Sequence, residues 1–407
     1  MRRRKFIINT ALATSGLAAG VGSGKLFAAN DTIQIGVIGT GSRGAYEVAL
    51  LRGVPGVKVT ACCDILADHL EDGLREAGSG AQGFSDYREL LARRDLDAVI
   101  IATPLYLHYP MAAAALKSGK HVYCEKTMTY SIQEAIDLAK QAQKSDRVFQ
   151  VGYQWRTNPL HKTVVDLIRK GELGRITHIF AHYHRNGSWR RPVSDPSLEK
   201  IINWRMYREY SGGLMTELCS HQIDVANWIL EEPPEKVTGI GGLDFWLDGR
   251  EIFDNVSTIF AYPGGVKAVF SSITTNSQMG VVMRILGTEA AIEIRREQGQ
   301  EAFIFAEPSR REEKREAVDG VSSATQKAWE AGEGVPIPVP GRADSDDVTS
   351  RIALDHFMGC IRTGGKPESN AETGRDAAIT VHMANMAMET GEMQVWKTEY
   401  SGQGSDG

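Results

Sequence analysis

The sequence predicts an α/β protein whose first part is a doubly wound parallel sheet with helices on both faces. Three observations support this prediction. The chain has 407 residues, which is more than one ordinary hydrophobic core accommodates, so two domains are expected. Short apolar runs alternate with helix-like runs between residues 33 and 152, which is the order of a parallel sheet. A glycine-rich turn joins the first apolar run to the first helix-like run.

The strand Ile33–Ile38 and the turn that follows it predict a dinucleotide site. Gly39 allows a tight turn, and Gly41 lets backbone N–H groups approach a pyrophosphate. Gly44 lets the following helix, expected over residues 45–52, pack closely on the strand. The residues of this turn are Gly39, Thr40, Gly41, Ser42, Arg43 and Gly44.

An acidic residue then selects the cofactor. The strand Val57–Cys63 ends at Asp64, which lies 20 residues beyond Gly44 (64 − 44). A carboxylate at this distance binds the ribose hydroxyls of the adenosine and repels a 2′-phosphate, so we expect NAD rather than NADP.

The alternation of strands and helices continues to residue 152. Strands are expected over 96–102, 121–124 and 148–152, with helices within 81–94 and over 108–118 and 131–144. Ligands bind at the carboxyl ends of such strands. The residues that directly follow strands, and are therefore expected near the cofactor, are Asp64, Thr103, Pro104, Glu125, Lys126 and Gln154.

The composition excludes several classes of protein. Asp and Glu number 51 against 46 Lys and Arg, so the formal net charge is −5, and 42% of the residues are hydrophobic. A mildly acidic chain without a lysine-rich block is a poor candidate for nucleic-acid binding. After the N-terminus no apolar run reaches the ~18 residues of a membrane helix, so no span is expected in the mature protein. The five cysteines include no CxxC pair and predict neither a disulfide framework nor a zinc site.

Residues 1–30 have the features of an export signal. Arg2, Arg3 and Arg4 precede an apolar stretch rich in Ala and Gly that ends in Ala28 and Ala29. The paired arginines resemble a twin-arginine signal. We therefore expect a periplasmic or otherwise exported protein, the alternative being a frayed basic tail on a cytosolic enzyme. Twin-arginine export moves folded proteins, which allows a cofactor to travel with the chain.

Several motifs resemble the Gfo/Idh/MocA family, which includes glucose–fructose oxidoreductase and inositol dehydrogenase. The resemblance covers roughly residues 32–395. The matching residues are the turn 39–44, Ala102-Thr103-Pro104 with His108, the run His121-Val122-Tyr123-Cys124-Glu125-Lys126, and Gly212-Gly213 before Glu217, His221 and Asp224.

The resemblance implies a Rossmann domain, taken as residues 31–153, followed by an α/β domain with a large, open, mostly antiparallel sheet, taken as residues 154–395. The alternation over Ile176 to His184 agrees with such a sheet. Residues 307–347 are polar and are expected to form an exposed excursion. Further strands are expected over 237–245, 255–261, 265–274 and 281–286, a helix over 214–230, and late helices over 351–363 and 374–390 that pack back on the first domain.

The resemblance also implies the roles of the site residues. Lys126 bonds the reacting hydroxyl and relays a proton, and His221 accepts the alcohol proton as hydride leaves for the nicotinamide. The cofactor is expected to contact Gly39, Thr40, Gly41, Ser42, Arg43, Gly44, Asp64, Thr103, Pro104, His108, Glu125, Lys126, Gln154, Trp204 and Arg205. The substrate is expected to contact Lys126, Tyr153, Arg156, His182, His184, Glu217, His221 and Asp224, with Asp224 as an orienting partner.

Two residues depart from the family pattern. Thr127 follows Glu125-Lys126 where the family usually has proline, so we do not expect the cis peptide bond often found there. Glu217 stands where the family commonly has aspartate, which lengthens a carboxylate in the substrate site and leaves the substrate class open.

Three functions remain open. The first is an exported NAD-dependent oxidoreductase that acts on a hydroxyl of a sugar or glycoside, with ring carbon 3 as one candidate position. The second is a glycosidase in which tightly bound NAD is reduced and reoxidised within one turnover. The third is a non-catalytic sugar-binding protein of the cell envelope, which the complete set of motif residues disfavours. The periplasm offers little free NAD, so a retained cofactor is expected.

Two further expectations concern metal and assembly. His182, His184, Glu217 and His221 have the donor types of a zinc site. A lysine-based hydride-transfer site explains the same residues without metal, so no metal is expected. A homo-oligomer is expected because exposed sheets in this family commonly pair.

Overall fold

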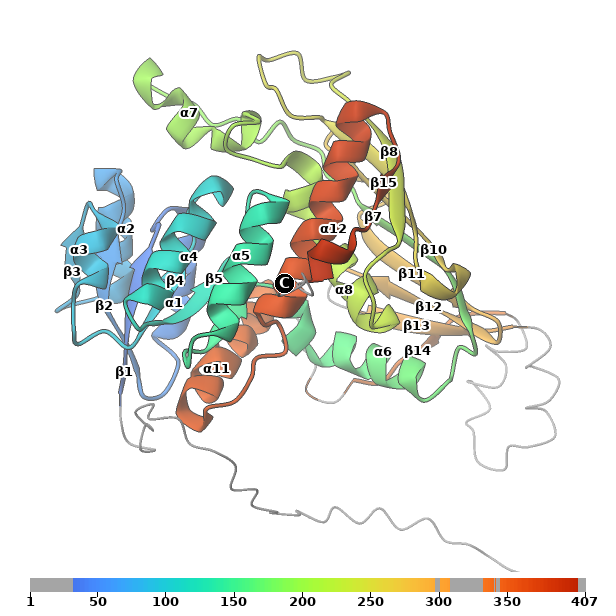
Figure 1. The fold of residues 1–407 in the computed structure, drawn as a ribbon, viewed down its shortest axis with the longest axis horizontal. Coiled ribbons are helices and arrows are strands. Elements are labelled where there is room, and N and C mark those ends of the chain that lie inside the picture. The colour runs from blue at the N-terminus through green and yellow to red at the C-terminus, as the bar shows by residue number, and fades with distance from the viewer. Residues whose placement is uncertain (1–31, 297–300, 308–331, 340, 342–344, 402–407) are drawn as a thin grey trace, which may run out of the picture.

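The computed structural model describes residues 32–296, 301–307, 332–339, 341 and 345–401 (Figure 1). The predicted export signal, residues 1–30, and most of the predicted polar excursion lie outside the described residues. Within the described part of the chain, no helix is long and apolar enough to cross a lipid bilayer.

The first domain contains a six-stranded sheet whose neighbouring strands all run parallel, in the order β3-β2-β1-β4-β5-β6. The residues of β4 and β5 are buried throughout, because helices cover both faces. The predicted doubly wound fold is confirmed. Its strands are β1 (Ile33–Ile38), β2 (Val57–Cys63), β3 (Gln82–Phe84), β4 (Ala98–Ile101), β5 (His121–Cys124) and β6 (Phe149–Val151), and its helices are α1 (Ser42–Leu51), α2 (Ala67–Ala77), α3 (Tyr87–Leu91), α4 (His108–Lys117) and α5 (Ile132–Gln143).

The second domain contains a nine-stranded sheet in the order β14-β13-β12-β11-β7-β10-β9-β8-β15. The pair β7 and β10 is parallel and the other neighbouring pairs are antiparallel, so the mostly antiparallel sheet is confirmed. The strands are β7 (Ile176–Tyr183), β8 (Lys236–Gly242), β9 (Asn255–Ala261), β10 (Lys267–Ile273), β11 (Val281–Gly287), β12 (Ala290–Arg295), β13 (Glu301–Ala306), β14 (Val335–Pro336) and β15 (Gln394–Val395).

Helices cover one face of this sheet and join it to the first domain. In Figure 1, α12 (Ala371–Thr390) lies between α5 of the first domain and β8 of the second, and α11 (Asp346–Thr363) packs under α1. The remaining helices are α6 (Pro159–Arg169), α7 (Glu199–Ile202), α8 (Ser220–Leu230), a π-helix over Met215–Cys219, and 3-10 turns over Leu105–Leu107, Gln154–Thr157, Pro196–Leu198, Trp204–Met206, Pro263–Gly265 and Thr398–Ser401.

Both late helices begin earlier than predicted because polar side chains cap them. The Ser345 hydroxyl accepts a hydrogen bond from the Val348 amide, so α11 begins at Asp346. The Asn370 side chain accepts hydrogen bonds from the Glu372 and Thr373 amides, so α12 begins at Ala371.

The predicted exposed excursion over 307–347 is wrong at one place. Val335 and Pro336 form β14, which pairs with β13 at the edge of the second sheet. The Ile337 amide donates to the Ala302 carbonyl at 2.8 Å, and the Ile337 side chain is buried. Burial of the Ile337 side chain, together with the backbone pairing, explains why this piece joins the sheet although its surroundings are polar.

A buried ion pair joins the 3-10 turn after β6 to α8. Arg156 Nε lies 2.9 Å from Asp224 Oδ2, and Arg156 Nη2 lies 2.9 Å from Asp224 Oδ1. Both side chains are almost fully buried. Burial raises the pKa of Asp224, and the Arg156 charge opposes that effect. Both residues were predicted to bind substrate, but neither lines the cavity described below, because they turn toward each other.

We predict that replacing either partner of this pair lowers the free energy of unfolding, and that the two replacements lower it by different amounts. Asp224→Asn leaves a buried guanidinium that cannot lose its proton, so the free energy of unfolding should fall by about 3–5 kcal/mol. Arg156→Met leaves a carboxyl that takes up a proton, so it should cost less. The measurement is urea unfolding at fixed cofactor concentration.

The cost of Arg156→Met should also depend on pH. Without Arg156 the folded-state pKa of Asp224 rises further above its unfolded value, so the folded state binds the extra proton. Stability is then retained at low pH and lost as pH rises above about 4, the unfolded value. Arg169→Met, which breaks the exposed Arg169–Glu231 pair, is the control and should cost under about 1 kcal/mol. Equal costs for the buried and exposed pairs would contradict the special role of the buried one.

Candidate active site

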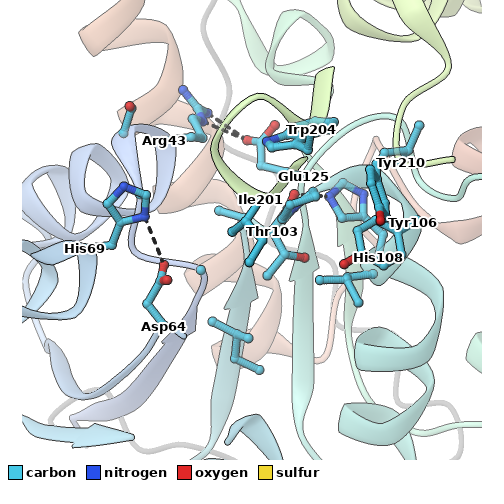
Figure 2. A pocket seen from close by; sticks show the side chains of 18 of the residues that line it. Arg43, Asp64, His69, Thr103, Tyr106, His108, Glu125, Ile201, Trp204 and Tyr210 are labelled. Carbon is cyan, nitrogen blue, oxygen red and sulfur yellow. Dashed lines mark hydrogen bonds and ion pairs between the residues drawn. The ribbon is translucent and has the colours of Figure 1, made fainter. Parts of the chain in front are cut away.

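A cavity of about 420 Å³ lies between the two domains, at the carboxyl ends of the parallel strands. Its volume is within the usual range of small-molecule sites. The first domain contributes the glycine turn and the residues after β2, β4 and β5, and the second domain contributes residues 191–221 (Figure 2). Most of the predicted cofactor residues line it: Gly39, Gly41, Ser42, Arg43, Asp64, Thr103, Pro104, His108, Glu125, Lys126, Gln154, Trp204 and Arg205.

The glycine turn has the geometry of a pyrophosphate cradle. Gly39 has φ +84°, and a Cβ there would lie 2.9 Å from the Ala102 backbone. A Cβ at Gly44 would lie 1.8 Å from the Gly39 carbonyl oxygen, so α1 packs on the turn only with glycine there. No side chain caps α1 at Gly41, which leaves its first amides facing the cavity. These residues fit the phosphates of a dinucleotide.

Asp64 is fixed at the end of β2 by two backbone amides. Its carboxylate accepts from the Thr40 amide at 2.8 Å and from the Leu66 amide at 2.9 Å. Thr40 was predicted to contact the cofactor, but it is buried and positions Asp64 instead. His69 Nδ1 lies 3.7 Å from Asp64 Oδ2, and its interaction with this carboxylate raises the pKa of His69. Figure 2 marks the contact with a dashed line.

Arg43 binds two carboxylates beneath the cavity. Its Nη2 donates to Glu125 at 2.8 Å, and its Nε lies 3.1 Å from buried Glu47 (Figure 2 shows the Glu125 contact). Burial raises the pKa of Glu47 well above its usual value. Burial also acts to raise the pKa of Glu125, but the Arg43 charge outweighs it and lowers that pKa. The Arg43 charge therefore favours the ionised form of Glu125, and burial favours the protonated form of Glu47.

Lys126 comes from the first domain, but the second domain holds its ammonium group. Lys126 Nζ donates to the Glu217 carbonyl at 2.9 Å and to the Thr216 carbonyl at 3.3 Å. Both carbonyls belong to the π-helix Met215–Cys219. The wider π turn leaves carbonyls free to accept bonds from outside the helix. Lys126 is thereby fixed at the boundary between the domains.

The peptide bond between Lys126 and Thr127 is cis, so the expectation drawn from the missing proline is wrong. Thr127 is bonded on both sides. Its hydroxyl donates to the Thr216 carbonyl at 3.1 Å, and its own carbonyl lies 2.8 Å from His108 Nδ1. The other ring nitrogen of His108 lies 3.0 Å from the Thr103 carbonyl. These contacts hold the backbone there without proline.

His221 lies buried at the wall of the cavity. Its ring is 5.0 Å from the Trp155 ring and 6.0 Å, edge to face, from the Tyr153 ring. Burial lowers the pKa of His221 well below its usual value, and the Lys126 charge adds to the effect. Its Nδ1 makes no hydrogen bond to any residue that the structure describes. His221 is therefore a neutral imidazole with proton-accepting capacity.

Glu217 forms an ion pair inside the cavity. Its carboxylate accepts from Arg205 Nε at 2.7 Å, and the Arg205 guanidinium lies 4.2 Å over the Trp204 ring. Burial acts to raise the pKa of Glu217, but the Arg205 and Lys126 charges prevail and lower it. An ionised carboxylate, a guanidinium and an indole face thus lie together beside Lys126.

The structure does not bring every predicted substrate residue to this cavity. Tyr153 is buried behind His221. His182 bonds the Met279 carbonyl at 3.0 Å and His184 bonds Ser271 at 3.2 Å, and neither lines the cavity. His182 lies on β7, on the same face as Phe180, which is 41% exposed, and His184 follows just beyond the end of the strand. The described residues contain no group of three or more His, Cys, Asp or Glu arranged to hold a metal ion.

Several cavity residues were missed by the sequence reasoning. His69 lies on α2 and Tyr106 in the 3-10 turn Leu105–Leu107. The others, Arg191, Lys200, Ile201 and Tyr210, come from a stretch whose aromatic and basic side chains were the available signal. Tyr106 and Tyr210 contact each other, with ring centroids 4.9 Å apart (Figure 2).

Comparison with known proteins identifies the family. Residues 33–153 match the oxidoreductase family with an NAD-binding Rossmann fold, and residues 161–293 match the GFO/IDH/MocA C-terminal domain. A glycosyl hydrolase family 109 protein of Shewanella amazonensis is 31% identical over 184 residues, which are 42% of this chain and 39% of that protein. The 2,7-anhydro-N-acetylneuraminate hydratase of Escherichia coli is 30% identical over 210 residues, 52% of this chain and 53% of that protein.

The chain thus spans about half the length, or less, of these curated relatives. Among solved structures, a levoglucosan dehydrogenase in complex with NADH and levoglucosan superimposes with a TM-score of 0.73 at 20% identity, covering 90% of this chain and 99% of that one. This likeness supports the fold, and the glycine turn with Asp64 supports NAD as the cofactor. The chain belongs to the Gfo/Idh/MocA family of NAD-binding oxidoreductases.

Proposed function

We propose that this protein oxidises a hydroxyl group of a sugar or glycoside, with ring carbon 3 as a candidate position, and retains NAD while doing so. The observation that carries the proposal is that Lys126, His221 and the Arg205–Glu217 pair line the same cavity as the glycine turn and Asp64. A hydrogen-bond donor for the reacting hydroxyl, a proton acceptor and groups that can bond neighbouring hydroxyls thus border the cofactor site.

Each of these residues has a defined task in such a reaction. Bound NAD+ supplies the acceptor for a hydride. Lys126, held by two carbonyls, donates a hydrogen bond to the reacting hydroxyl. His221, kept neutral by burial, takes the hydroxyl proton. Glu217 and Arg205 bond neighbouring hydroxyls, and Trp204 offers an apolar face to the C–H groups of a ring.

The relatives support a carbohydrate as the substrate class. They include a glycosyl hydrolase family 109 protein and an anhydro-sugar hydratase, and the superimposed structure is named for levoglucosan. The named substrates differ, so the proposal extends to the class and not to one sugar.

A glycosidase that oxidises its substrate only transiently is the second candidate, favoured by the similarity to family 109. In that reaction the oxidised carbon acidifies a neighbouring C–H group, and loss of that proton with elimination breaks the glycosidic bond and releases the aglycone as an alcohol. Water then adds to the resulting double bond, and the hydride returns, so that the net reaction is hydrolysis. The two functions differ in their products. The oxidoreductase yields a ketosugar, and the glycosidase yields a free sugar without net consumption of NAD.

We predict that Lys126 and His221 act in the oxidation step. Lys126→Ala should leave NAD bound but slow reduction of the bound cofactor by about 10²–10⁴-fold, because the hydrogen bond to the reacting hydroxyl and the proton relay are lost. His221→Ala should slow it similarly and also weaken substrate binding. The measurement is pre-steady-state absorbance of bound NADH after mixing with a panel of glycosides.

The matched control is Lys117→Ala, which removes an exposed lysine on α4 and should leave the rate unchanged. Reduction of bound NAD at the wild-type rate in Lys126→Ala would show that the lysine is structural. If both variants lose turnover but keep fast cofactor reduction, the residues serve a later elimination step, and the glycosidase is favoured.

We predict that Asp64 sets the preference for NAD over NADP. Asp64→Ser should lower the ratio of the Kd for NADP to the Kd for NAD by about tenfold or more, which corresponds to ~1.4 kcal/mol. The reason is that no carboxylate then repels the 2′-phosphate. Equilibrium titration with both cofactors measures it, and Asp68→Asn, an exposed change on α2, is the control. Equal binding of NAD and NADP by the wild type would refute this role.

We also propose that the protein is exported by the twin-arginine pathway, on the evidence of residues 1–30. A folded reporter fused behind these residues should reach the periplasm, and changing Arg3 and Arg4 to lysine should abolish its export. Fractionation of cells measures the outcome. Export that persists in the lysine variant would remove the proposal.

A further inference from the structure

Arg191 differs from the other arginines of the cavity in its partners. Arg43 is paired with Glu125, and Arg205 is paired with Glu217. Within the described part of the chain, the Arg191 guanidinium makes no ion pair with a carboxylate and one hydrogen bond, from Nη2 to the Ser42 hydroxyl at 3.0 Å. Its charge is therefore available to an anion in the cavity.

The position of this guanidinium indicates which anion it meets. Ser42 is the first residue of α1, directly after the glycine turn. The positive end of α1 and the amides of the turn make this the place for the dinucleotide pyrophosphate. Arg191 thus adds a positive charge there from the opposite side of the cavity, since it belongs to the second domain.

Hydrogen bonds and ion pairs hold the backbone of the segment around Arg191 in place. Buried Asn203 accepts from the Arg191 amide at 2.8 Å and donates to its carbonyl at 3.0 Å. Arg190, next to it, pairs with Glu199 and Asp248. Figure 1 shows this segment, with α7, reaching from the second domain over the helices of the first. The backbone of Arg191 is therefore fixed while its side chain points to the glycine turn.

We propose that Arg191 is a clasp that binds the pyrophosphate of NAD from the second domain and slows its release. Guanidinium–phosphate contacts are charge-assisted and bidentate, which makes them strong and directional. A bound dinucleotide would then be held between α1 and residues 191–203. Its release would require the Arg191 side chain, which contacts Ser42 across the domain boundary, to move away. The clasp deepens the proposed function, because it rests on the retention of NAD proposed above.

The test measures cofactor release and needs no substrate. The enzyme is loaded with NADH and mixed with excess NAD+, and the decay of NADH fluorescence gives the release rate. Arg191→Ala should release NADH about 10–100-fold faster, the usual effect of losing a charge-assisted hydrogen bond. Arg191→Lys, which keeps the charge but not the fork, should be intermediate. Arg175→Ala removes an exposed arginine outside the cavity and should match the wild type.

A ligand series locates the contact. Arg191→Ala should weaken ADP-ribose, which carries the pyrophosphate, as much as NADH, and should leave the affinity for adenosine unchanged. Release at the wild-type rate would overturn the proposal. An equal loss of affinity for adenosine would also overturn the proposal. It would mean that Arg191 contacts the nucleoside, or that its loss disturbs the whole site, and not that Arg191 binds the pyrophosphate. A larger loss for NADPH than for NADH would assign Arg191 to a 2′-phosphate and overturn it too.

The outcome separates this proposal from the proposed function. In one outcome, the wild type releases NADH at a rate above its turnover rate, and Arg191→Ala releases NADH faster still. The clasp is then supported, and the proposed retention of NAD is refuted. If the wild type retains NADH and Arg191→Ala does so equally, retention stands and the clasp fails.

Discussion

The ammonium group of Lys126 joins the two halves of the candidate active site. The lysine follows β5 of the first domain, but its acceptors are carbonyls of the π-helix in the second. One of these acceptors, the Thr216 carbonyl, lies within hydrogen-bond distance of three side chains, those of Lys126, Thr127 and Ser220. Gly213, at φ +64°, and Gly212, where a Cβ would lie 2.3 Å from Thr216, let the chain enter this turn. The placement of the Lys126 ammonium group therefore depends on the packing between the domains.

The charges around the cavity are paired so that a few groups remain free. Arg43 pairs with Glu125, and Arg205 pairs with Glu217. Within each pair the two charges cancel, and each side chain holds its partner in place. Burial keeps His221 neutral. Lys126, bonded to carbonyls, and Arg191, bonded to a hydroxyl, are the cations of the cavity whose charge no described carboxylate cancels by direct contact. Under our proposals, one serves the substrate hydroxyl and the other the pyrophosphate.

The sequence was most informative where function depends on local backbone geometry. The turn from Gly39 to Gly44 and the acid at Asp64 were predictable, because their spacing along one strand-turn-helix unit fixes their positions. Spacing alone did not decide which way a side chain faces. Arg156 and Asp224 lie close in sequence to Gln154 and His221, yet they turn toward each other. His182 lies on β7 but His184 lies just beyond its end, and alternation cannot say which face of a strand meets the cavity.

The second domain's cover over the cofactor site was the least predictable part. Residues 186–203 contain no periodic apolar pattern, and their position depends on tertiary contacts such as those of Asn203 with Arg191. Glu47 has one contact of each kind. It meets Arg43 one turn away in α1, which the i, i+4 spacing allows, but it lies near Glu125 only in the folded chain. Contacts between segments distant in sequence leave no local signal, so only the three-dimensional structure brings them out.

Direct transfer of a hydride from a sugar carbon to bound NAD is the central step of the proposed reaction. The most direct test uses glycosides that carry deuterium on single ring carbons, mixed with the NAD-loaded enzyme and quenched within the first turnover. Mass spectrometry of the released cofactor then shows whether the nicotinamide ring has gained the label. We predict deuterium in the cofactor from one ring position and from no other. Consumption of the substrate with no deuterium in the cofactor from any position would contradict direct hydride transfer.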